Sequence, residues 1–364
     1  MNALAPSIGA FSATPMVNRY RALVSGQSRG VAAELQRTGL TIASIPYGWA
    51  VRLRNRLYDR NWNRIVHAAV PVVSVGNLTL GGTGKTPCVE YVARFFREND
   101  LRVAILSRGY GADHGPNDEA LVLEENLPDV PHLQGADRAA LADCAVQELE
   151  SEVLVLDDGF QHRRLARDLD IVLVDATNPW GYGRLFPRGL LREPPAGLRR
   201  AQVVLLTRCD QANAEQRERL CASITRLAPN ATIGETIHQP IDLCNSDGTS
   251  QSLDEVRRQP VAAFCGLANS AAFRQTLLDL GANVQDFRTY PDHHSYTRTD
   301  VEDLRTWARQ QATDCLVVTT QKDLVKLRLT QLGGRALYAL RIRLHVDSGR
   351  EELDQKLRSI FIRP

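Results

Sequence analysis

The stretch that most constrains the fold of this chain is residues 70–96, VPVVSVGNLTLGGTGKTPCVEYVARFF. It begins with an apolar, β-branched run, passes through a turn rich in glycine, and continues with apolar residues at helical spacing. A strand, a glycine-rich loop and a helix in this order are typical of a phosphate-binding loop, because backbone N–H groups can turn inward only where no Cβ obstructs them. The sequence therefore predicts a nucleotide-binding α/β protein.

The end of this loop carries the residues that phosphate chemistry needs. The Lys85 ammonium is expected to reach the β- and γ-phosphates, and the Thr86 hydroxyl to bind Mg²⁺, at the positive end of the helix. The motif G-x-x-x-x-G-K-[ST] is not matched strictly, since Thr79 stands at its first glycine, and the alternative is an ordinary glycine-rich turn. We predict that phosphate is bound by Thr79, Gly81, Gly82, Thr83, Gly84, Lys85 and Thr86.

Length, charge and cysteine content limit the remaining possibilities. At about 150 residues per domain, 364 residues predict two domains. A formal net charge of +2 gives no reason to expect a nucleic acid partner. The seven cysteines are scattered and form no C-x-x-C pair, which favours a reduced cytoplasmic protein without structural zinc, and no secretory signal pattern is visible.

The N-terminal region divides into two parts. Residues 1–30 are expected to be poorly ordered, and residues 31–66 to form an amphipathic helix flanked by arginines. The uncharged run at 38–51 has 14 residues and contains Pro46, so it is too short for a bilayer, which needs about 20. The helix could lie in a membrane interface with its arginines on anionic headgroups, or it could pack against the body of the protein.

Beyond the loop, short apolar runs alternate with helical patterns. This alternation predicts a P-loop NTPase-like fold, with a mostly parallel sheet flanked by helices and ligands at the carboxyl ends of the strands. We assign residues 67–240 to this domain. A polar, loop-like passage at about 240–260 then leads into a smaller C-terminal α/β domain, residues 241–364.

A second chemical signal is VLVLDDGFQH, in which an apolar strand ends at Asp157 and Asp158. The strand delivers both carboxylates to the sheet edge where the phosphate loop lies, and oxygen ligands are what Mg²⁺ prefers. The alternative is an Asp pair that only caps the following turn.

Three further groups of residues could take part in catalysis. Asp118 and Glu119 lie in a polar loop, and His293 lies just after a predicted strand; either could face the proton of an acceptor hydroxyl, or all could be solvated. The stretch GYGRLFPRGLLREPP holds arginines suited to phosphate, or it is a rigid surface loop. Its charged members are Arg184, Arg188, Arg192 and Glu193.

Another class of protein remains open. Residues 207–210, Thr-Arg-Cys-Asp, loosely resemble the base-reading element of GTP-binding proteins. A GTPase would also carry an aspartate three residues before Gly159, where this chain has Leu156. A GTPase that acts as a metallochaperone or targeting switch is therefore the weaker alternative, and a scaffold that binds nucleotide without chemistry is a third.

Taken together, the segments resemble one family, the tetraacyldisaccharide 4′-kinases, which are the lipid A 4′-kinases of Gram-negative bacteria. The similarity extends from about Arg19 to the last strand. It is carried, in this order, by SIPYGWAVRLRNRLYDR, SVGNLTLGGTGKTP, LSRGYG, NDEA, DDGFQHRRLARDLDIVLVDA, GRLFPRGLLREP, YPDHH and TTQKDLVKL. The family usually has G-D-E-P where this chain has Asn-Asp-Glu-Ala at 117–120, so a glycine and a proline that shape that loop are absent.

This resemblance implies a kinase that uses ATP and Mg²⁺ to phosphorylate the 4′-hydroxyl of an acylated glucosamine disaccharide 1-phosphate, giving lipid IVA. It implies a peripheral protein at the cytoplasmic face of the inner membrane, with the N-terminal helix on the membrane surface; we favour a monomer. Asp118 matches the proposed base and His293 its assistant. The remaining implied roles are catalysis by Lys85, Asp157 and Asp158, metal binding by Thr86, Asp157, Asp158 and Glu193, and substrate binding by Arg192 and Arg184.

Overall fold

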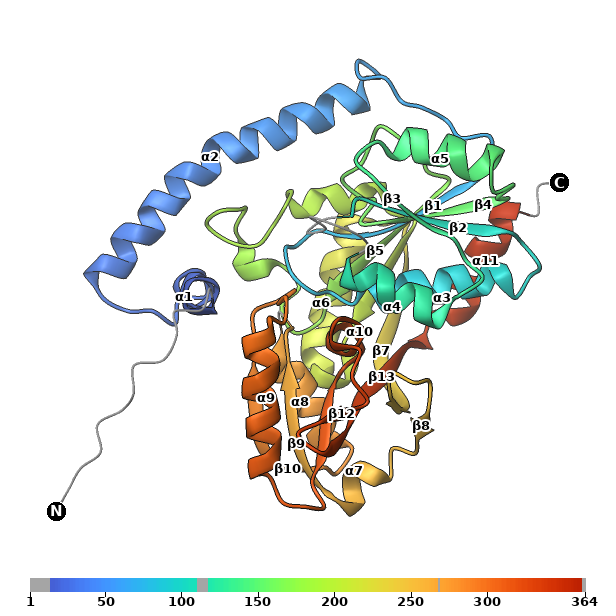
Figure 1. Cartoon of the computed structure of the whole chain (residues 1–364). Helices are drawn as coiled ribbons and strands as arrows, with labels where there is room; N and C mark the ends of the chain where they lie inside the picture. Colours follow the sequence, from blue (N-terminus) through green and yellow to red (C-terminus); the bar gives the residue numbers. More distant parts are fainter. Residues whose placement is uncertain (1–13, 110–116, 268, 362–364) are drawn as a thin grey trace.

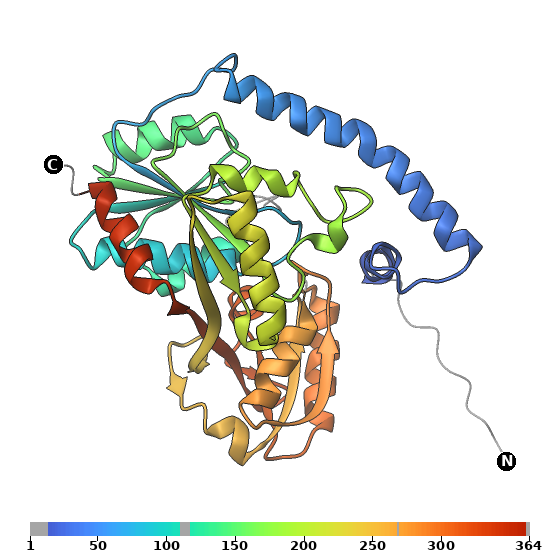
Figure 2. The same cartoon turned by 180° about the vertical axis from the view of Figure 1, so that it is seen from behind.

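A computed structural model describes residues 14–109, 117–267 and 269–361, and one sheet runs through both halves of the molecule (Figures 1 and 2). The strand order is β10-β9-β11-β13-β7-β6-β5-β1-β4-β2-β3, with the short strands β8 and β12 paired to its side. All pairs along this order are parallel except β13 with β7. The predicted α/β architecture is confirmed.

The first half is built around β1 (Val72–Asn77), which lies between β4 (Val153–Asp157) and β5 (Leu169–Asp175). These strands are buried on both faces, which is why they appear in the sequence as continuous apolar runs. The other strands of this half are β2 (Val103–Ser107), β3 (His132–Gln134) and β6 (Val203–Thr207). Its helices are α3 (Lys85–Arg97), α4 (Asp118–Asn126), α5 (Arg138–Gln147), η1 (Gly181–Gly183), η2 (Pro195–Arg200), η3 (Cys209–Gln211) and α6 (Ala214–Leu227).

Two long antiparallel strands join the halves. β7 (Thr232–Cys244) and β13 (Arg335–Ser348) pair along most of their length. The expectation of a loop from about residue 240 is wrong for its first part, because β7 continues to Cys244. Many β7 residues are only half-buried, so the strand lacks the apolar run that revealed its neighbours. The short elements β8 (Ser250–Gln251) and α7 (Glu255–Arg258) follow.

The second half alternates strands and helices as predicted. Its elements are β9 (Pro260–Cys265), α8 (Ser270–Asp279), β10 (Asn283–Thr289), α9 (Arg298–Gln310), β11 (Leu316–Thr320), α10 (Gln321–Leu327) and β12 (Gln331–Leu332). The last helix, α11 (Arg350–Phe361), returns to the first half, where Leu353, Leu357 and Ile360 join the core beneath α3 (Figures 1 and 2). The division at residue 240 into two domains stays a prediction, since the sheet and α11 both cross it.

Two helices precede the sheet. Residues 1–13 of the segment expected to be poorly ordered lie outside the described residues, but α1 (Thr14–Val24) is helical, so that expectation is wrong for this part. The amphipathic helix predicted over residues 31–66 is α2 (Val31–Asp59), so its predicted end is wrong. It contains Pro46 and reaches well beyond the body of the molecule (Figures 1 and 2). Across residues 14–109, 117–267 and 269–361, no helix is both long enough and apolar enough to cross a bilayer.

Candidate active site

The conformation of the phosphate loop, residues 78–86, is fixed by a close approach at Gly84 and by hydrogen bonds from Asn77. Gly84 has a left-handed φ of +86°, and a Cβ there would lie 2.3 Å from Nε2 of His238. Asn77, at the end of β1, donates to the carbonyl of Thr79 and to Oγ1 of Thr83, both at 2.8 Å. The loop is therefore fixed in a conformation that requires glycine at position 84.

A cavity of about 580 Å³ opens over this loop at the carboxyl ends of the parallel strands. Both halves of the molecule line it, and so do all the predicted phosphate-binding residues from Gly81 to Thr86. Thr79 does not line the cavity, because it is buried and pairs with Leu191 of the following arginine-rich loop. The position of Thr79 therefore does not support its predicted part in phosphate binding, whereas Gly81 to Thr86 stay candidates.

The two aspartates at the end of β4, Asp157 and Asp158, lie in different environments. Asp158 is 3.5 Å from the Lys85 ammonium, and Arg192 donates to both of its oxygens at 2.7 and 2.8 Å. Although burial opposes ionisation of Asp158, these cations lower its pKa. Asp157 is buried, its Oδ1 has no hydrogen-bond partner, and burial together with Glu119 raises its pKa to about 7. A buried carboxylate oxygen left unpaired is the kind of atom that a cation would satisfy.

The donor set fits Mg²⁺ better than a metal held by protein alone. Asp157 and the buried hydroxyl of Thr86 both line the cavity. In the part of the chain that the structure describes, no three His, Cys, Asp or Glu side chains come together as a metal cluster. Mg²⁺ commonly uses one or two protein ligands and completes its shell with phosphate oxygens and water, which this arrangement allows.

Asp118 and His293, which the sequence could not place together, are in contact. Nδ1 of His293 lies 2.9 and 3.0 Å from the two oxygens of Asp118. The expectation that Asp118 lies in a loop is wrong, because Asp118 is the first residue of α4. The N-cap of this helix is Asn117, whose side chain accepts a hydrogen bond from the backbone N–H of Ala120 at 2.9 Å. The asparagine that replaces the family's usual glycine therefore caps the helix that presents Asp118.

The electrostatics of this pair give its members different roles. Burial opposes the charge on Asp118, but the hydrogen bond from His293 and the nearby Lys322 and Lys326 outweigh it and lower the Asp118 pKa to about 2. The same hydrogen bond raises the pKa of His293. His293 lines the cavity and its side chain is 50% exposed, whereas that of Asp118 is 5% exposed and does not line it. Of the two residues, only His293 therefore faces the cavity.

Sequence reasoning missed Lys322 as a site residue. Its ammonium lies 2.6 Å from Oε1 of Glu119, and both residues line the cavity from opposite halves of the molecule. Lys322 mainly lowers the pKa of Glu119, and although burial opposes the charge of Lys322, the acidic neighbours raise its pKa. The available signal was position, since Lys322 lies two residues beyond the carboxyl end of β11, close to where Asp158 lies beyond that of β4.

Two predicted site residues lie elsewhere. Arg184 is exposed and does not line the cavity, so its position does not support substrate binding there. Glu193 is fully buried outside the cavity lining, where Asn55, Gln161 and Arg200 donate to its carboxylate. That carboxylate is already satisfied by protein donors, so its position does not support direct metal binding.

Comparison with known proteins shows the family of this chain. The profile described as "Tetraacyldisaccharide-1-P 4'-kinase" matches residues 36–361. The chain belongs to the tetraacyldisaccharide-1-P 4'-kinase family. This confirms the family predicted from the sequence motifs.

Relatives in this kinase family cover most of the chain. The tetraacyldisaccharide 4'-kinase of Anaeromyxobacter sp. (strain Fw109-5) is 42% identical over 330 residues, covering 85% of this chain and 88% of that protein. The namesake from Anaeromyxobacter sp. (strain K) is 44% identical over 322 residues, with 82% and 83% covered. The "apo" form of LpxK from Aquifex aeolicus, solved in complex with ATP, aligns with a TM-score of 0.71 at 31% identity, covering 90% of this chain and 99% of that one.

Proposed function

We propose that this family member transfers the γ-phosphoryl group of ATP to the 4'-hydroxyl of a tetraacylated glucosamine disaccharide 1-phosphate, forming lipid IVA. The observation that carries the proposal is the Asp118–His293 contact, because it brings a proton acceptor from the second half to the cavity that holds the phosphate loop. A phosphate site and a base facing one cavity are what transfer to an alcohol requires.

The nucleotide phosphates would be held by the phosphate loop. Its backbone N–H groups and the N-terminus of α3 favour the polyanion, and Lys85 stabilises the charge that develops on the transferring group. Thr86 and Asp157 would hold Mg²⁺, while Arg192 keeps Asp158 ionised beside Lys85. Bound Mg²⁺ would neutralise negative charge on the β- and γ-phosphates.

The proton of the acceptor hydroxyl would pass to His293. With a pKa of about 2, Asp118 is too acidic to keep a proton at neutral pH, whereas an imidazole with a pKa above 6.5 can take one. Asp118 accepts the Nδ1–H of His293, which turns Nε2 toward the reactants and stabilises the imidazolium that forms. This assigns proton transfer to His293 and orientation to Asp118, the reverse of what the family resemblance suggested.

Asp210 of the loosely base-reading element lines the cavity, but Arg208, at the lysine position of that element, is held by protein partners. Arg208, which stood in the loosely base-reading element, donates to the carbonyl of Gly82 at 2.7 Å and pairs with Asp175. Its guanidinium therefore supports the phosphate loop and is committed to protein partners. The cavity instead offers an apolar end, lined by Phe273, Leu340 and Ile342, against which a purine ring could pack.

We further propose that α2 rests on the cytoplasmic face of the inner membrane. Apolar side chains recur along its outer face and remain exposed, with Trp49 73% exposed. They are accompanied by exposed arginines, which suit anionic headgroups. The exposed apolar residues of α2 and the segment after it are Val31, Leu35, Ile42, Ile45, Trp49, Leu53 and Trp62.

A nucleotide competition assay tests this function. The purified chain is incubated with the acylated disaccharide 1-phosphate and either ATP or GTP, and lipid products are separated by chromatography. The proposal predicts a bisphosphorylated lipid with ATP. Hydrolysis of GTP in strong excess over ATP, with no lipid product, would favour a GTPase instead.

A further inference from the structure

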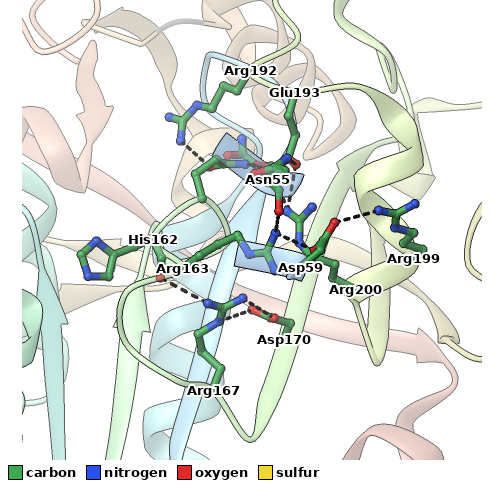
Figure 3. A network of polar contacts seen from close by, with 12 residues as sticks. Asn55, Asp59, His162, Arg163, Arg167, Asp170, Arg192, Glu193, Arg199 and Arg200 are labelled. Atoms are coloured by element: carbon green, nitrogen blue, oxygen red, sulfur yellow. Dashed lines mark hydrogen bonds and ion pairs between the residues drawn. The ribbon is translucent and has the colours of Figure 1, made fainter. Parts of the chain in front are cut away.

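Glu193 is the most enclosed charged group near the phosphate site that the proposed chemistry leaves unused. Its carboxylate is fully buried and accepts from Gln161 at 2.9 Å, from Arg200 at 2.9 Å and from Nδ2 of Asn55 at 3.0 Å. Asn55 comes from α2, and Figure 3 shows it turned toward Glu193. The helix proposed to contact the membrane thus touches a buried charge inside the protein.

From Glu193 a chain of hydrogen bonds leads to the phosphate site. Gln161 donates to Glu193 through its amide and accepts from Arg192 through Oε1 at 3.2 Å. The same Arg192 nitrogen donates to Asp158, which lies beside Lys85. Gln161 also donates to the carbonyl of Asn77, at 2.9 Å, where β1 passes into the phosphate loop.

A second contact joins α2 to the same residues. The Tyr47 hydroxyl donates to the carbonyl of Arg192 at 2.8 Å, and the Tyr47 ring packs edge-on against Phe186 with centroids 5.7 Å apart. Arg192 in turn donates its backbone N–H to the carbonyl of Leu78 in the phosphate loop, at 2.8 Å. Both ends of Arg192, its guanidinium and its backbone, are therefore held between α2 and the phosphate site.

The surroundings leave Glu193 little freedom to move. A Cβ on Gly197 would lie 2.6 Å from its Oε2, and Arg200 stacks its guanidinium over the Phe160 ring at 4.3 Å. Only the NH₂ side of the Asn55 amide can face a carboxylate, since its oxygen would be repelled. A displacement of Asn55 would therefore be passed on to Gln161 and Arg192.

We propose that Asn55 is a positioning residue that couples the placement of α2 to the geometry of Arg192 and Asp158 at the phosphate site. When α2 rests on the membrane, the Asn55 amide holds Glu193 and Gln161 so that Arg192 stays on Asp158. This inference depends on the proposed function. It adds to that function the statement that docking of α2 sets the catalytic rate as well as the location of the enzyme.

The test uses the full chain with labelled ATP and the acylated disaccharide 1-phosphate in anionic vesicles. Asn55→Ala removes the donor, and we expect kcat to fall about tenfold with the KM for ATP changed by less than about twofold. Sedimentation with vesicles should equal that of the wild type, because Asn55 faces inward. The matched control is Thr38→Ala, an exposed position on α2 whose hydroxyl bonds only within the helix at 2.9 Å; it should keep wild-type constants.

Two further variants separate positioning from folding. Tyr47→Phe keeps the ring on Phe186 but removes the hydroxyl, and we expect it to lower kcat in the same way. Asn55→Gln keeps an amide and should recover part of the activity that Asn55→Ala loses. Thermal unfolding midpoints of all variants are measured in parallel, and the loss of kcat should exceed any that destabilisation explains.

The outcomes are distinct. Wild-type kcat in both Asn55→Ala and Tyr47→Phe overturns the inference, as does a fall in activity matched by an equal loss of vesicle binding. A wild-type chain that forms no bisphosphorylated lipid overturns the proposed function itself, and the inference with it.

Discussion

At the scale of single residues, the site depends on side chains whose environments push their properties apart. Oδ1 of Asp157 has no hydrogen-bond partner and the Asp157 pKa is raised, while Lys85 and Arg192 lower the pKa of Asp158 beside it. The pKa values of Asp118 and His293 are also shifted in opposite directions, since that of Asp118 is lowered and that of His293 is raised. The sequence predicted the identities of these residues. It could not predict the Asp118–His293 contact, because the two residues are 175 positions apart in the sequence and local patterns carry no information on contacts so far apart.

Gly84→Ala should abolish nucleotide binding while the chain still folds. The left-handed backbone costs a β-carbon roughly 1–2 kcal/mol, and the methyl group would collide with His238, so the loop must move away from the phosphates. Equilibrium binding of ATP measures the effect, with circular dichroism to confirm folding. Gly82→Ala is the matched control, because a Cβ at that position has no heavy atom within 4 Å. This variant should bind ATP at least about ten times more tightly than Gly84→Ala.

Asp157→Asn should remove kinase activity but stabilise the metal-free protein above pH 7. The pKa of this carboxyl group rises on folding to about 7. Its contribution to the free energy of unfolding is therefore largest below its pKa in the unfolded chain, and it is lost as the pH rises through its pKa in the folded chain. Replacing it with a neutral amide removes that loss. We expect the thermal midpoint at pH 8 in a chelator to rise by about 2 °C or more, with little difference at about pH 3, where the carboxyl is protonated in both the folded and the unfolded chain. A lower midpoint at pH 8 would contradict a buried carboxyl group with a raised pKa.

The pH dependence of kcat should show a rising limb with a pKa above 6.5, since His293 accepts a proton only when neutral and Asp118 raises its pKa. Asp118→Asn should move this limb to lower pH and lower the plateau, because the amide no longer favours the imidazolium. His293→Gln should remove the limb. The pair also contributes to the free energy of unfolding. The contribution of His293 declines as the pH rises above 6.5 through its raised pKa, and that of Asp118 is lost as the pH falls from 3.8 through its lowered pKa of about 2. An unshifted limb in Asp118→Asn would show that another group titrates.

At the scale of elements, the sequence succeeded where burial is uniform and failed where it is mixed. β1, β4, β5 and β6 are buried throughout and appeared as apolar runs. β7 is buried at few of its positions and was read in part as loop. The start of α4 was missed because its first turn is polar, although Asn117 is a residue that favours the N-cap.

Asn117→Ala should therefore destabilise the chain by about 1 kcal/mol, as loss of an N-cap does. Because the cap sets the first turn of α4, which carries Asp118, kcat should fall as well. Urea unfolding and steady-state kinetics measure the two effects. Asn117→Asp, which can still cap, is the control and should keep most of the stability; equal stability of the Ala variant would show that the cap contributes little.

At the scale of the whole molecule, the cavity exists because the chain returns on itself. β13 pairs with β7, α10 brings Lys322 onto Glu119 of α4, and α11 packs under α3. The periodicity of the sequence predicted the two sets of α/β elements, but the order in which one sheet joins them follows from long-range pairing that periodicity does not contain. α2 lies outside this frame and offers its apolar face to a surface.

Charging that face should release the protein from membranes. The double variant Ile42→Glu with Trp49→Glu places carboxylates where the side chains are 63% and 73% exposed, so folding should be unaffected. We expect sedimentation with anionic vesicles to fall at least about tenfold, since apolar contact is lost and the added carboxylates are repelled by anionic headgroups. Leu149→Glu, an exposed apolar position beyond α5, is the control and should sediment as the wild type does. Unchanged sedimentation of the double variant would exclude α2 as the contact.

The central claim is that one cavity joins the phosphate loop to a proton acceptor for a sugar hydroxyl. The most direct test is to incubate the wild-type chain with γ-labelled ATP and the acylated disaccharide 1-phosphate, and to locate the new phosphate by NMR. The account predicts a label on the 4'-hydroxyl, and none with Lys85→Ala. Label released only as inorganic phosphate, with the disaccharide unchanged, would contradict it.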